Sequence, residues 1–420
     1  MTDGGGQTPI AQGPVSRGSV VRVGLATVIS AICGYVVLYL AARDLEPAGF
    51  SVFAVFWGAF GLVAGAANGL LQESTREVRQ AQQAGTEQGP HTNPMRVAAA
   101  VAVVAGVLIA ATSPLWSWHV FADARLLSVA LLAVGLAGFC LHATLLGVLG
   151  GVDRWGEYGT LIVGDAAMRV VVAVATFLVG WGLVGYLWAT VAGAFSWVAL
   201  LLASRSTRAA ARRLTPGTAV TFLRGATHSI AAAGASAILI MGFPVLLKAT
   251  STELGAAGGV VILAVTLTRA PLLVPLTAMQ GNLIAHFVDR RDQRVRALLA
   301  PAAVTVALGA VAVAIAGLFG PWLLRTVFGP EYVAGGALLA WFTAAAVSIA
   351  LLTLTGAATV AAALHRAYAI GWVSATLASV LLLLLPVSLE TRTVVALLCG
   401  PLIGMAVHLF ALTRSASMSV

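Results

Sequence analysis

The chain has 420 residues, of which 60% are hydrophobic and only 9% are charged, although the formal net charge is +9. A soluble domain carries about 25% charged residues, so this composition excludes a soluble globular protein and indicates a chain that has lipid as its solvent. The positive charge does not indicate nucleic-acid binding, because the basic residues lie between apolar stretches rather than on one polar face. We therefore expect no nucleic-acid partner.

The apolar stretches after a short polar beginning define the predicted architecture. Residues 1–16 are rich in Gly, Thr, Pro and Gln, which predicts a disordered tail. The later stretches have about 20 residues each, enough to cross a membrane, and they are predicted to be helices because backbone groups in lipid must pair within their own segment. The twelve predicted spans are Val20–Ala42, Gly49–Leu71, Val97–His119, Leu126–Leu149, Tyr158–Val179, Leu183–Ser204, Gly225–Leu247, Leu254–Ala278, Leu298–Gly320, Val333–Ala357, Ala367–Leu389 and Thr393–Leu412.

Lysine and arginine are concentrated in every second connection between these spans. With the N-terminus placed inside, 17 of the 24 cationic residues lie on the inner side and 5 on the outer side, while Arg169 and Arg269 lie within spans. Cytoplasmic connections carry such an excess of positive charge. The even number of spans then places both termini in the cytoplasm, and we expect a multi-pass protein of the plasma or inner membrane.

The two halves of the chain are similar to each other. The sequence LEPAGF, which begins at Leu45, matches LGAAGG, which begins at Leu254, at an offset of 209 residues. Arg154 and Arg366 follow the fourth and tenth spans at an offset of 212. We therefore predict two six-helix lobes with the substrate site at their interface. The predicted parts are the tail 1–16, an N-lobe over 17–204, a cytoplasmic linker over 205–224, a C-lobe over 225–414 and a second tail over 415–420.

The eighth span places Arg269 just before Pro271 and Pro275. A charge near the centre of a membrane helix costs about 2.5–3.5 kcal/mol and persists only with a partner or a water-filled cavity. Guanidinium pairs well with phosphate, so Arg269 is the first candidate for binding a diphosphate. Alternatively, Arg269 pairs with Asp165 or with backbone carbonyls and only stabilises the fold. Each proline removes a backbone donor, which predicts either a hinge or a simple kink.

Asp165 and Arg169 lie four residues apart within the fifth span, and therefore on one face of the helix. They are candidates for lining the substrate path, or for neutralising each other as a structural pair. Asp165 is the only acid deep within a span. It is therefore the candidate for coupling transport to protons or sodium ions.

Amide side chains at the inner ends of the second and eighth spans are candidates for a rim that hydrogen-bonds sugar hydroxyls. Ordinary polarity at helix ends is the alternative explanation. No group of His, Cys, Asp or Glu has metal-ligand spacing, so we expect neither a metal nor a cofactor. The rim candidates are Asn68, Gln72, Gln280 and Asn282.

Three stretches carry a resemblance to a known family: residues 40–53 (LAARDLEPAGFSVF), 319–332 (FGPWLLRTVFGPEY) and 361–368 (AAALHRAY). Together with the order of the spans, they make residues 17–414 resemble the multidrug/oligosaccharidyl-lipid/polysaccharide exporter superfamily, and within it the polysaccharide (O-antigen, Wzx-type) flippases. The resemblance implies an all-α, MATE-like pair of lobes in a V and alternating access. It also implies export of a polyprenyl-diphosphate-linked oligosaccharide for cell-surface polysaccharide biosynthesis.

A flippase for lipid-linked oligosaccharide is therefore the leading hypothesis, with that lipid-linked sugar and membrane lipids as partners. A cation-coupled multidrug antiporter of the same fold is the alternative, but such relatives commonly use an acid in the first span, and Val20–Ala42 contains none. A membrane enzyme is disfavoured because the outer acids are scattered on short loops. A major-facilitator transporter is disfavoured because its Gly- and Arg-rich signature is missing from Ser74–Arg79.

Overall fold

The computed structural model describes residues 17–84, 89–279, 283, 286–288, 290 and 294–417. Ten helices in this part of the chain are long and apolar enough to cross a membrane, and eleven when the bent pair α8–α9 counts as one span. The first of them, α1 (Arg17–Ala84), consists of two helices joined at Glu46. Dividing α1 there gives the predicted twelve crossings within the described residues.

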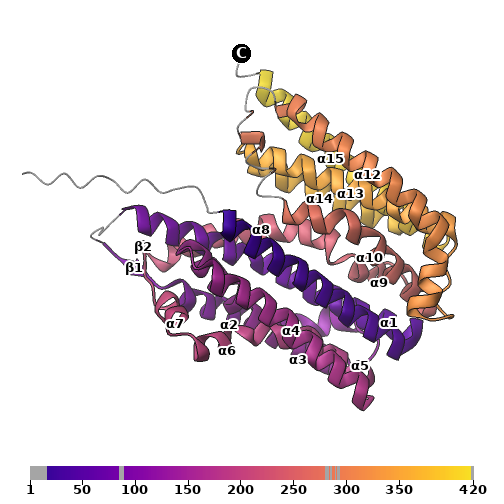
Figure 1. Cartoon of the computed structure of the whole chain (residues 1–420), viewed down its shortest axis with the longest axis horizontal. Coiled ribbons are helices and arrows are strands. Elements are labelled where there is room, and N and C mark those ends of the chain that lie inside the picture. The colour runs from indigo at the N-terminus through magenta and orange to yellow at the C-terminus, as the bar shows by residue number, and fades with distance from the viewer. Residues whose placement is uncertain are drawn as a thin grey trace, which may run out of the picture.

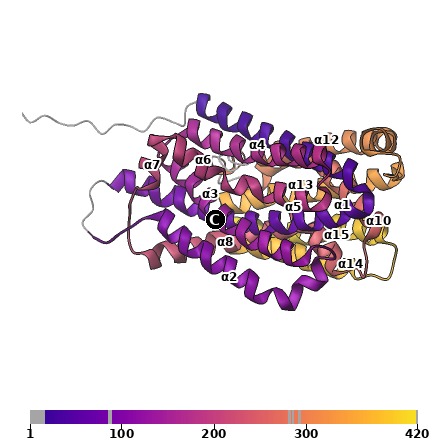
Figure 2. The same ribbon diagram turned by 90° about the horizontal axis from the view of Figure 1, so that it is seen from below.

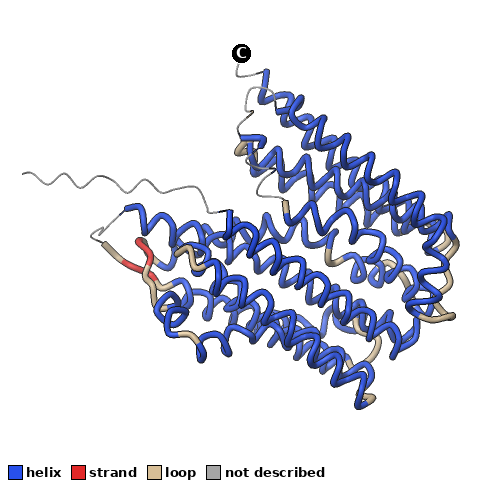
Figure 3. Tube along the Cα trace, viewed as in Figure 1, coloured by secondary structure: helices blue, strands red, loops and turns tan. Residues whose placement is uncertain are grey.

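Helices make up almost all of the described residues, and within these residues two short strands interrupt them (Figure 3). After α1, the N-lobe contains β1 (His91–Thr92), α2 (Pro94–Val120), α3 (Arg125–Gly151), α4 (Trp155–Val179), α5 (Gly182–Ala192), η1 (Gly193–Phe195) and α6 (Ser196–Ala203). The remaining elements are α7 (Arg205–Ala211), β2 (Thr215–Pro216), α8 (Ala219–Ile240), α9 (Phe243–Ala249), α10 (Gly255–Ala278), α12 (Arg294–Leu323), η3 (Leu324–Phe328), α13 (Gly336–Ala361), α14 (His365–Leu383) and α15 (Leu389–Ser417).

The two lobes form a V, as the resemblance implies. In Figure 1 the indigo-to-magenta helices form one arm and the orange and yellow helices form the other. The arms meet at the end where α1 turns back, which we call the closed end, and they diverge at the end where α7 and the C-terminus lie, the open end. Figure 2 shows the first part of α1 along one edge of the molecule, beside α4, with α2 along the opposite edge.

Two pairs of tight turns confirm the internal repeat. Glu46 and Gly255, at an offset of 209 residues, both have left-handed backbone conformations, with φ of 54° and 52°. Asp153 and Ala363, at an offset of 210, have φ of 57° and 58°. The backbone therefore aligns Arg154 with residue 364, and the predicted pairing of Arg154 with Arg366 at an offset of 212 requires a gap of two residues.

Two predicted spans are broken in the structure. The sixth, predicted as Leu183–Ser204, consists of α5, the 3-10 turn η1 and α6. The seventh, predicted as Gly225–Leu247, consists of α8 and α9, whose axes differ by 67°. The break lies at Met241 and Gly242, and Pro244 in the first turn of α9 has no N–H to continue the helix α8.

The connections at the open end contain structure that composition did not predict. The linker 205–224 includes α7, β2 and the beginning of α8, and β2 pairs antiparallel with β1. Asn93 strengthens this link, because its amide donates to the carbonyls of Ala211 and Arg213, both at 3.1 Å. Two-residue strands of Thr, His and Pro carry no hydrophobic period and could not be predicted from such a pattern.

The largest buried cluster contains side chains from both lobes, among them Phe50, Phe53, Leu263 and Phe342. Small residues permit the close packing of the second part of α1 against α8: a Cβ at Gly69 would overlap the backbone of Ile230. Such close approach is a common way for membrane helices to associate. The lobes are therefore packed together at the closed end and along α1.

Candidate functional site at the lobe interface

Arg269 on α10 lies at the break between α8 and α9. Its side chain is buried, with 8% of the residue exposed. Nη1 donates to the carbonyl of Ile240, the last residue of α8, at 3.2 Å, and Cζ lies 5.1 Å from the centroid of the Phe243 ring, in the first turn of α9. The end of a helix carries unpaired carbonyls and partial negative charge, so this contact stabilises both the break and the cation.

The other side of the Arg269 guanidinium has no such partner. Nη2 is buried and has no hydrogen-bond partner among the residues that the structure describes. The ion pairs of the described chain do not include Arg269, so the predicted alternative of a pair with Asp165 is not formed, whereas the backbone-carbonyl contact is. Tyr35 on the first part of α1 is close enough to interact electrostatically with Arg269. A buried cation with a free donor is able to bind an anion.

Asp165 and Arg169 form an ion pair within α4, with Nη2 of Arg169 3.0 Å from Oδ1 of Asp165. The two side chains are only 14% and 15% exposed, respectively. The Arg169 guanidinium lies over two rings of α1, 5.4 Å from the centroid of Phe60 and 5.9 Å from that of Trp57. Gly193 in η1 leaves room for the pair, because a Cβ there would overlap Asp165.

His142 on α3 was not among the predicted site residues, yet it lies next to this pair. Its ring is buried, Nδ1 is 3.2 Å from Oγ of Ser196, and it interacts electrostatically with Asp165 and Arg169. A single histidine in an apolar span does not indicate from sequence alone that it lies beside Asp165 and Arg169. The N-lobe therefore contains a polar cluster of four side chains from α3, α4 and α6.

The structure describes two of the four residues predicted to form the rim. Asn68 and Gln72 lie on the second part of α1, four residues apart, with Asn68 half-buried and Gln72 exposed. Gln280 and Asn282 lie outside the described residues. Glu73, which follows Gln72, is 3% exposed and forms an ion pair with Arg76. No hydrogen bond or ion pair joins Asn68 or Gln72 to Arg269 in the part of the chain that the structure describes.

Pro271 and Pro275 do not interrupt α10, which stays helical from Gly255 to Ala278. Each lacks a backbone N–H, so the carbonyls of Leu267 and Pro271 receive no helical hydrogen bond from them. Pro271 also lines an apolar cavity of about 230 Å³ between α10, α12 and α13. The hinge therefore remains a prediction.

Aromatic side chains join the lobes at the closed end. The hydroxyl of Tyr332, which follows η3, donates to the carbonyl of Ala42 in α1 at 2.9 Å. The Tyr332 ring lies 6.3 Å from that of Phe50, and the Phe328 ring lies 5.9 Å from that of Tyr39. Burial, with Glu331 and Glu46 nearby, raises the pKa of Tyr332, so the hydroxyl keeps its proton and remains a donor.

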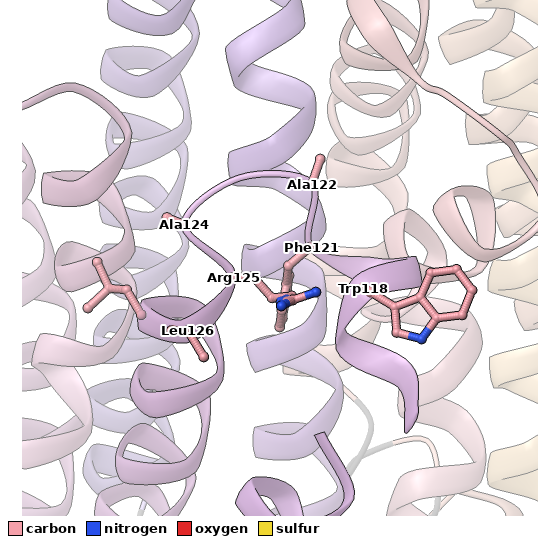
Figure 4. A pocket seen from close by; sticks show the side chains of 7 residues that line it. Trp118, Phe121, Ala122, Ala124, Arg125 and Leu126 are labelled. Carbon is pink, nitrogen blue, oxygen red and sulfur yellow. The ribbon is translucent and has the colours of Figure 1, made fainter. Parts of the chain in front are cut away.

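A separate hollow of about 520 Å³ lies at the connection between α2 and α3 (Figure 4). None of the predicted site residues lines it, and it belongs to the N-lobe alone. Its lining residues are Trp118, Phe121, Ala122, Ala124, Arg125, Leu126 and Leu127. We therefore keep the lobe interface as the candidate site.

Comparison with other sequences places the chain among mycobacterial proteins. It is 67% identical over 411 residues to uncharacterized protein Mb3654 of Mycobacterium bovis, covering 98% of this chain and 95% of that protein. The chain belongs to the same family as this protein. Uncharacterized protein Rv1510 of Mycobacterium tuberculosis is 65% identical over 414 residues, covering 99% of this chain and 96% of that protein. No family model matches the chain.

Solved structures show the fold. An inward-facing multidrug resistance MATE family transporter of the MOP superfamily matches with a TM-score of 0.71 and 16% identity, over 96% of this chain and 100% of that one. An outward-facing one matches with a TM-score of 0.63 and 17% identity, over 95% and 96%. A MOP superfamily transporter from Pyrococcus furiosus Vc1 (DSM3638) gives 0.58 and 16%, over 94% and 95%.

The chain thus has the MATE fold and is a multi-pass membrane protein. The predicted all-α, MATE-like fold is confirmed, while the transport activity and the flippase specificity stay predictions. The higher TM-score with the inward-facing structure agrees with arms that diverge at one end only.

Proposed function

We propose that this protein exports a polyprenyl-diphosphate-linked oligosaccharide for cell-surface polysaccharide biosynthesis, by alternating access between its two lobes. The observation that carries the proposal is Arg269, a buried cation without a carboxylate partner in the described chain and with one terminal nitrogen unpartnered. A diphosphate offers several charged acceptor oxygens, and guanidinium binds such groups through paired, charge-assisted hydrogen bonds. Arg269 would then contact the one group that all such substrates share.

The orientation of the V supports entry of this substrate from the inner leaflet. The arms diverge at the end that carries the arginine-rich connections, including Arg205 and Arg224. Because cytoplasmic connections carry an excess of positive charge, this open end and both termini would face the cytoplasm. We place the protein in the plasma membrane, where a lipid-linked sugar built on the cytoplasmic leaflet would reach the interface of the lobes.

The other predicted residues have roles consistent with this substrate. Asn68 and Gln72, together with Gln280 and Asn282, would hydrogen-bond the sugar hydroxyls. Asp165 would couple transport to protons, because its protonation dissolves the pair with Arg169 and leaves a second cation free to attract the diphosphate.

A cation-coupled multidrug antiporter is the second candidate, and two observations favour it. The inward-facing neighbour is a multidrug resistance transporter, and Asp165 supplies an acid within a span. For the Pyrococcus furiosus transporter, reverse polarity of the binding pocket is reported to suggest a different function. The two candidate functions require binding pockets of opposite charge, because a cationic pocket favours anions and disfavours cationic drugs.

A binding experiment separates the two candidates. Purified wild type and Arg269→Gln are titrated with a polyprenyl diphosphate and with the uncharged polyprenol of the same length. Loss of charge-assisted hydrogen bonds predicts that Arg269→Gln weakens diphosphate binding about 10- to 100-fold and leaves polyprenol binding unchanged. Arg205→Gln, an exposed arginine on α7, is the control and should bind like the wild type. Equal diphosphate binding by wild type and Arg269→Gln, or tighter binding of a cationic dye, would favour the antiporter.

A further inference from the structure

A groove separates the first part of α1 from α4 at the open end. It has a volume of about 470 Å³, within the roughly 300–1,000 Å³ range of ligand pockets. Arg22, Leu25 and Ile29 line it from α1, and Trp155, Val163 and Ala167 are among its lining residues on α4. None of the predicted site residues lines this groove.

The groove is polar at one end and apolar along its length. Arg22 and Trp155 lie at its mouth, and tryptophan is enriched where a membrane helix meets the headgroup region. From Trp155 to Ala167 the helix rises about 18 Å, at 1.5 Å per residue. This is slightly more than half of the roughly 30 Å hydrocarbon core. The groove therefore extends from the headgroup level to about the middle of the bilayer, the depth of one lipid tail.

Arg22 has no ion-pair partner among the described residues, unlike several arginines nearby in the fold. Arg76 pairs with Glu73 and Glu77, and Arg79 pairs with Asp153. Arg22 is exposed at the mouth of the groove, on the side where the cytoplasmic leaflet carries anionic lipids. A lipid phosphate would supply the missing negative charge.

We infer that this groove binds one anionic membrane lipid, with its phosphate at Arg22 and one hydrocarbon tail along the face of α4 between Trp155 and Ala167. The charge of Arg22, the apolar lining and the depth each match this class of ligand. The inference does not depend on which substrate the protein exports.

Photo-crosslinking tests the inference on the full-length protein in nanodiscs. The probe is phosphatidic acid with a diazirine at the middle of one tail, and the labelled peptides are identified by mass spectrometry. We expect labels concentrated on residues 22–29 and 155–167. Arg22→Gln should reduce this labelling about fivefold, because one basic residue near an anionic headgroup contributes on the order of 1 kcal/mol.

A second variant fills the groove without changing its charge. A Cβ at Gly156 meets no atom within 4 Å, so Gly156→Leu fits the fold and places its side chain in the groove. It should reduce the labelling severalfold, whereas Gly156→Ala, which leaves the space open, should not.

Arg205→Gln controls for general attraction to the leaflet. The inference is overturned if the exposed face of α12 is labelled as strongly as the groove, if Arg22→Gln and Gly156→Leu change nothing, or if phosphatidylcholine with the same tail labels equally.

Discussion

Arg269 uses one terminal nitrogen for the fold and leaves the other without a partner. The contact with Ile240 stabilises the end of α8, while Nη2 is buried without a hydrogen bond in the described chain. The sequence predicted that this arginine is special, because an in-span charge is costly. It did not predict Ile240, Phe243 or Tyr35 as neighbours, because these contacts depend on how α8, α9 and α1 pack around α10.

The Asp165–Arg169 pair permits a test at the level of single residues. Asp165→Asn removes the partner of a cation that is only 15% exposed, and we expect a loss of about 1–3 kcal/mol in the free energy of unfolding. Stability is measured by thermal denaturation in detergent. The double variant Asp165→Asn/Arg169→Met should recover most of the loss, since it leaves no unpaired charge. If the double variant is no more stable than Asp165→Asn alone, the pair does not stabilise the N-lobe.

At the level of elements, the turn at Glu46 carries backbone strain. Its φ of 54° and ψ of 172° belong to a region that is almost restricted to glycine. Gly255 occupies the equivalent turn of the second repeat, with φ of 52°. Glu46→Gly should therefore raise the free energy of unfolding by about 1 kcal/mol, as measured by thermal denaturation, while Gly255→Ala should lower it by about the same amount. A Cβ at Gly255 meets nothing within 4 Å, so only the backbone is tested there. Loss of stability in Glu46→Gly would show instead that the Glu46 side chain matters more than the strain.

The prolines of α10 give a second test at this scale. Pro271→Ala restores the donor that the carbonyl of Leu267 lacks and removes the ring that loosens the helix. If α10 bends during transport, we expect Pro271→Ala to slow transport severalfold in proteoliposomes and to leave substrate affinity unchanged. Thr277→Ala, on the same helix, is the control. An unchanged transport rate in Pro271→Ala would argue for a fixed kink.

The spans could be predicted from the sequence, because about twenty apolar residues cross a membrane and their backbone groups must pair within a helix. The breaks within them did not follow. Gly193 and Gly242 look like ordinary small residues in apolar helices. The first leaves room for Asp165, and the second precedes Pro244, which has no N–H to continue α8. The repeat was recognisable from LEPAGF and LGAAGG, but the positive φ angles were needed to align the turns after the fourth and tenth spans.

At the level of the whole molecule, contacts at the closed end hold the two lobes together. The hydrogen bond from Tyr332 to Ala42 crosses between the lobes. Tyr332→Phe removes it, which costs about 1 kcal/mol and should shift the population toward the outward-facing state about fivefold. Spin labels at Asp123 and Ser388, in outer connections of the two lobes, would report longer distances in pulsed electron spin resonance. Identical distance distributions in wild type and Tyr332→Phe would show that this bond does not set the balance.

The internal repeat predicted two lobes and the lysine and arginine pattern predicted the charge asymmetry, whereas the V was implied by the resemblance to the exporter superfamily. It did not predict which lobe contacts close one end, because Tyr332 and Ala42 lie 290 residues apart. It predicted separate charged residues, Arg269 and Asp165, but not that the structure keeps them in different contact networks, one at the break of α8 and one inside the N-lobe.

The most direct test of the central claim is a flipping assay in proteoliposomes with a fluorescent polyprenyl-diphosphate sugar. Wild type, Arg269→Ala and the control Arg205→Gln are compared at equal, folded protein levels. We expect transport by the wild type and the control, and a loss of at least tenfold in Arg269→Ala, because Arg269 is the buried cation with an unpartnered nitrogen at the end of α8 in the described chain. Equal transport by all three would reduce Arg269 to a structural residue, and efflux of a cationic dye without flipping of the sugar lipid would contradict the proposed function.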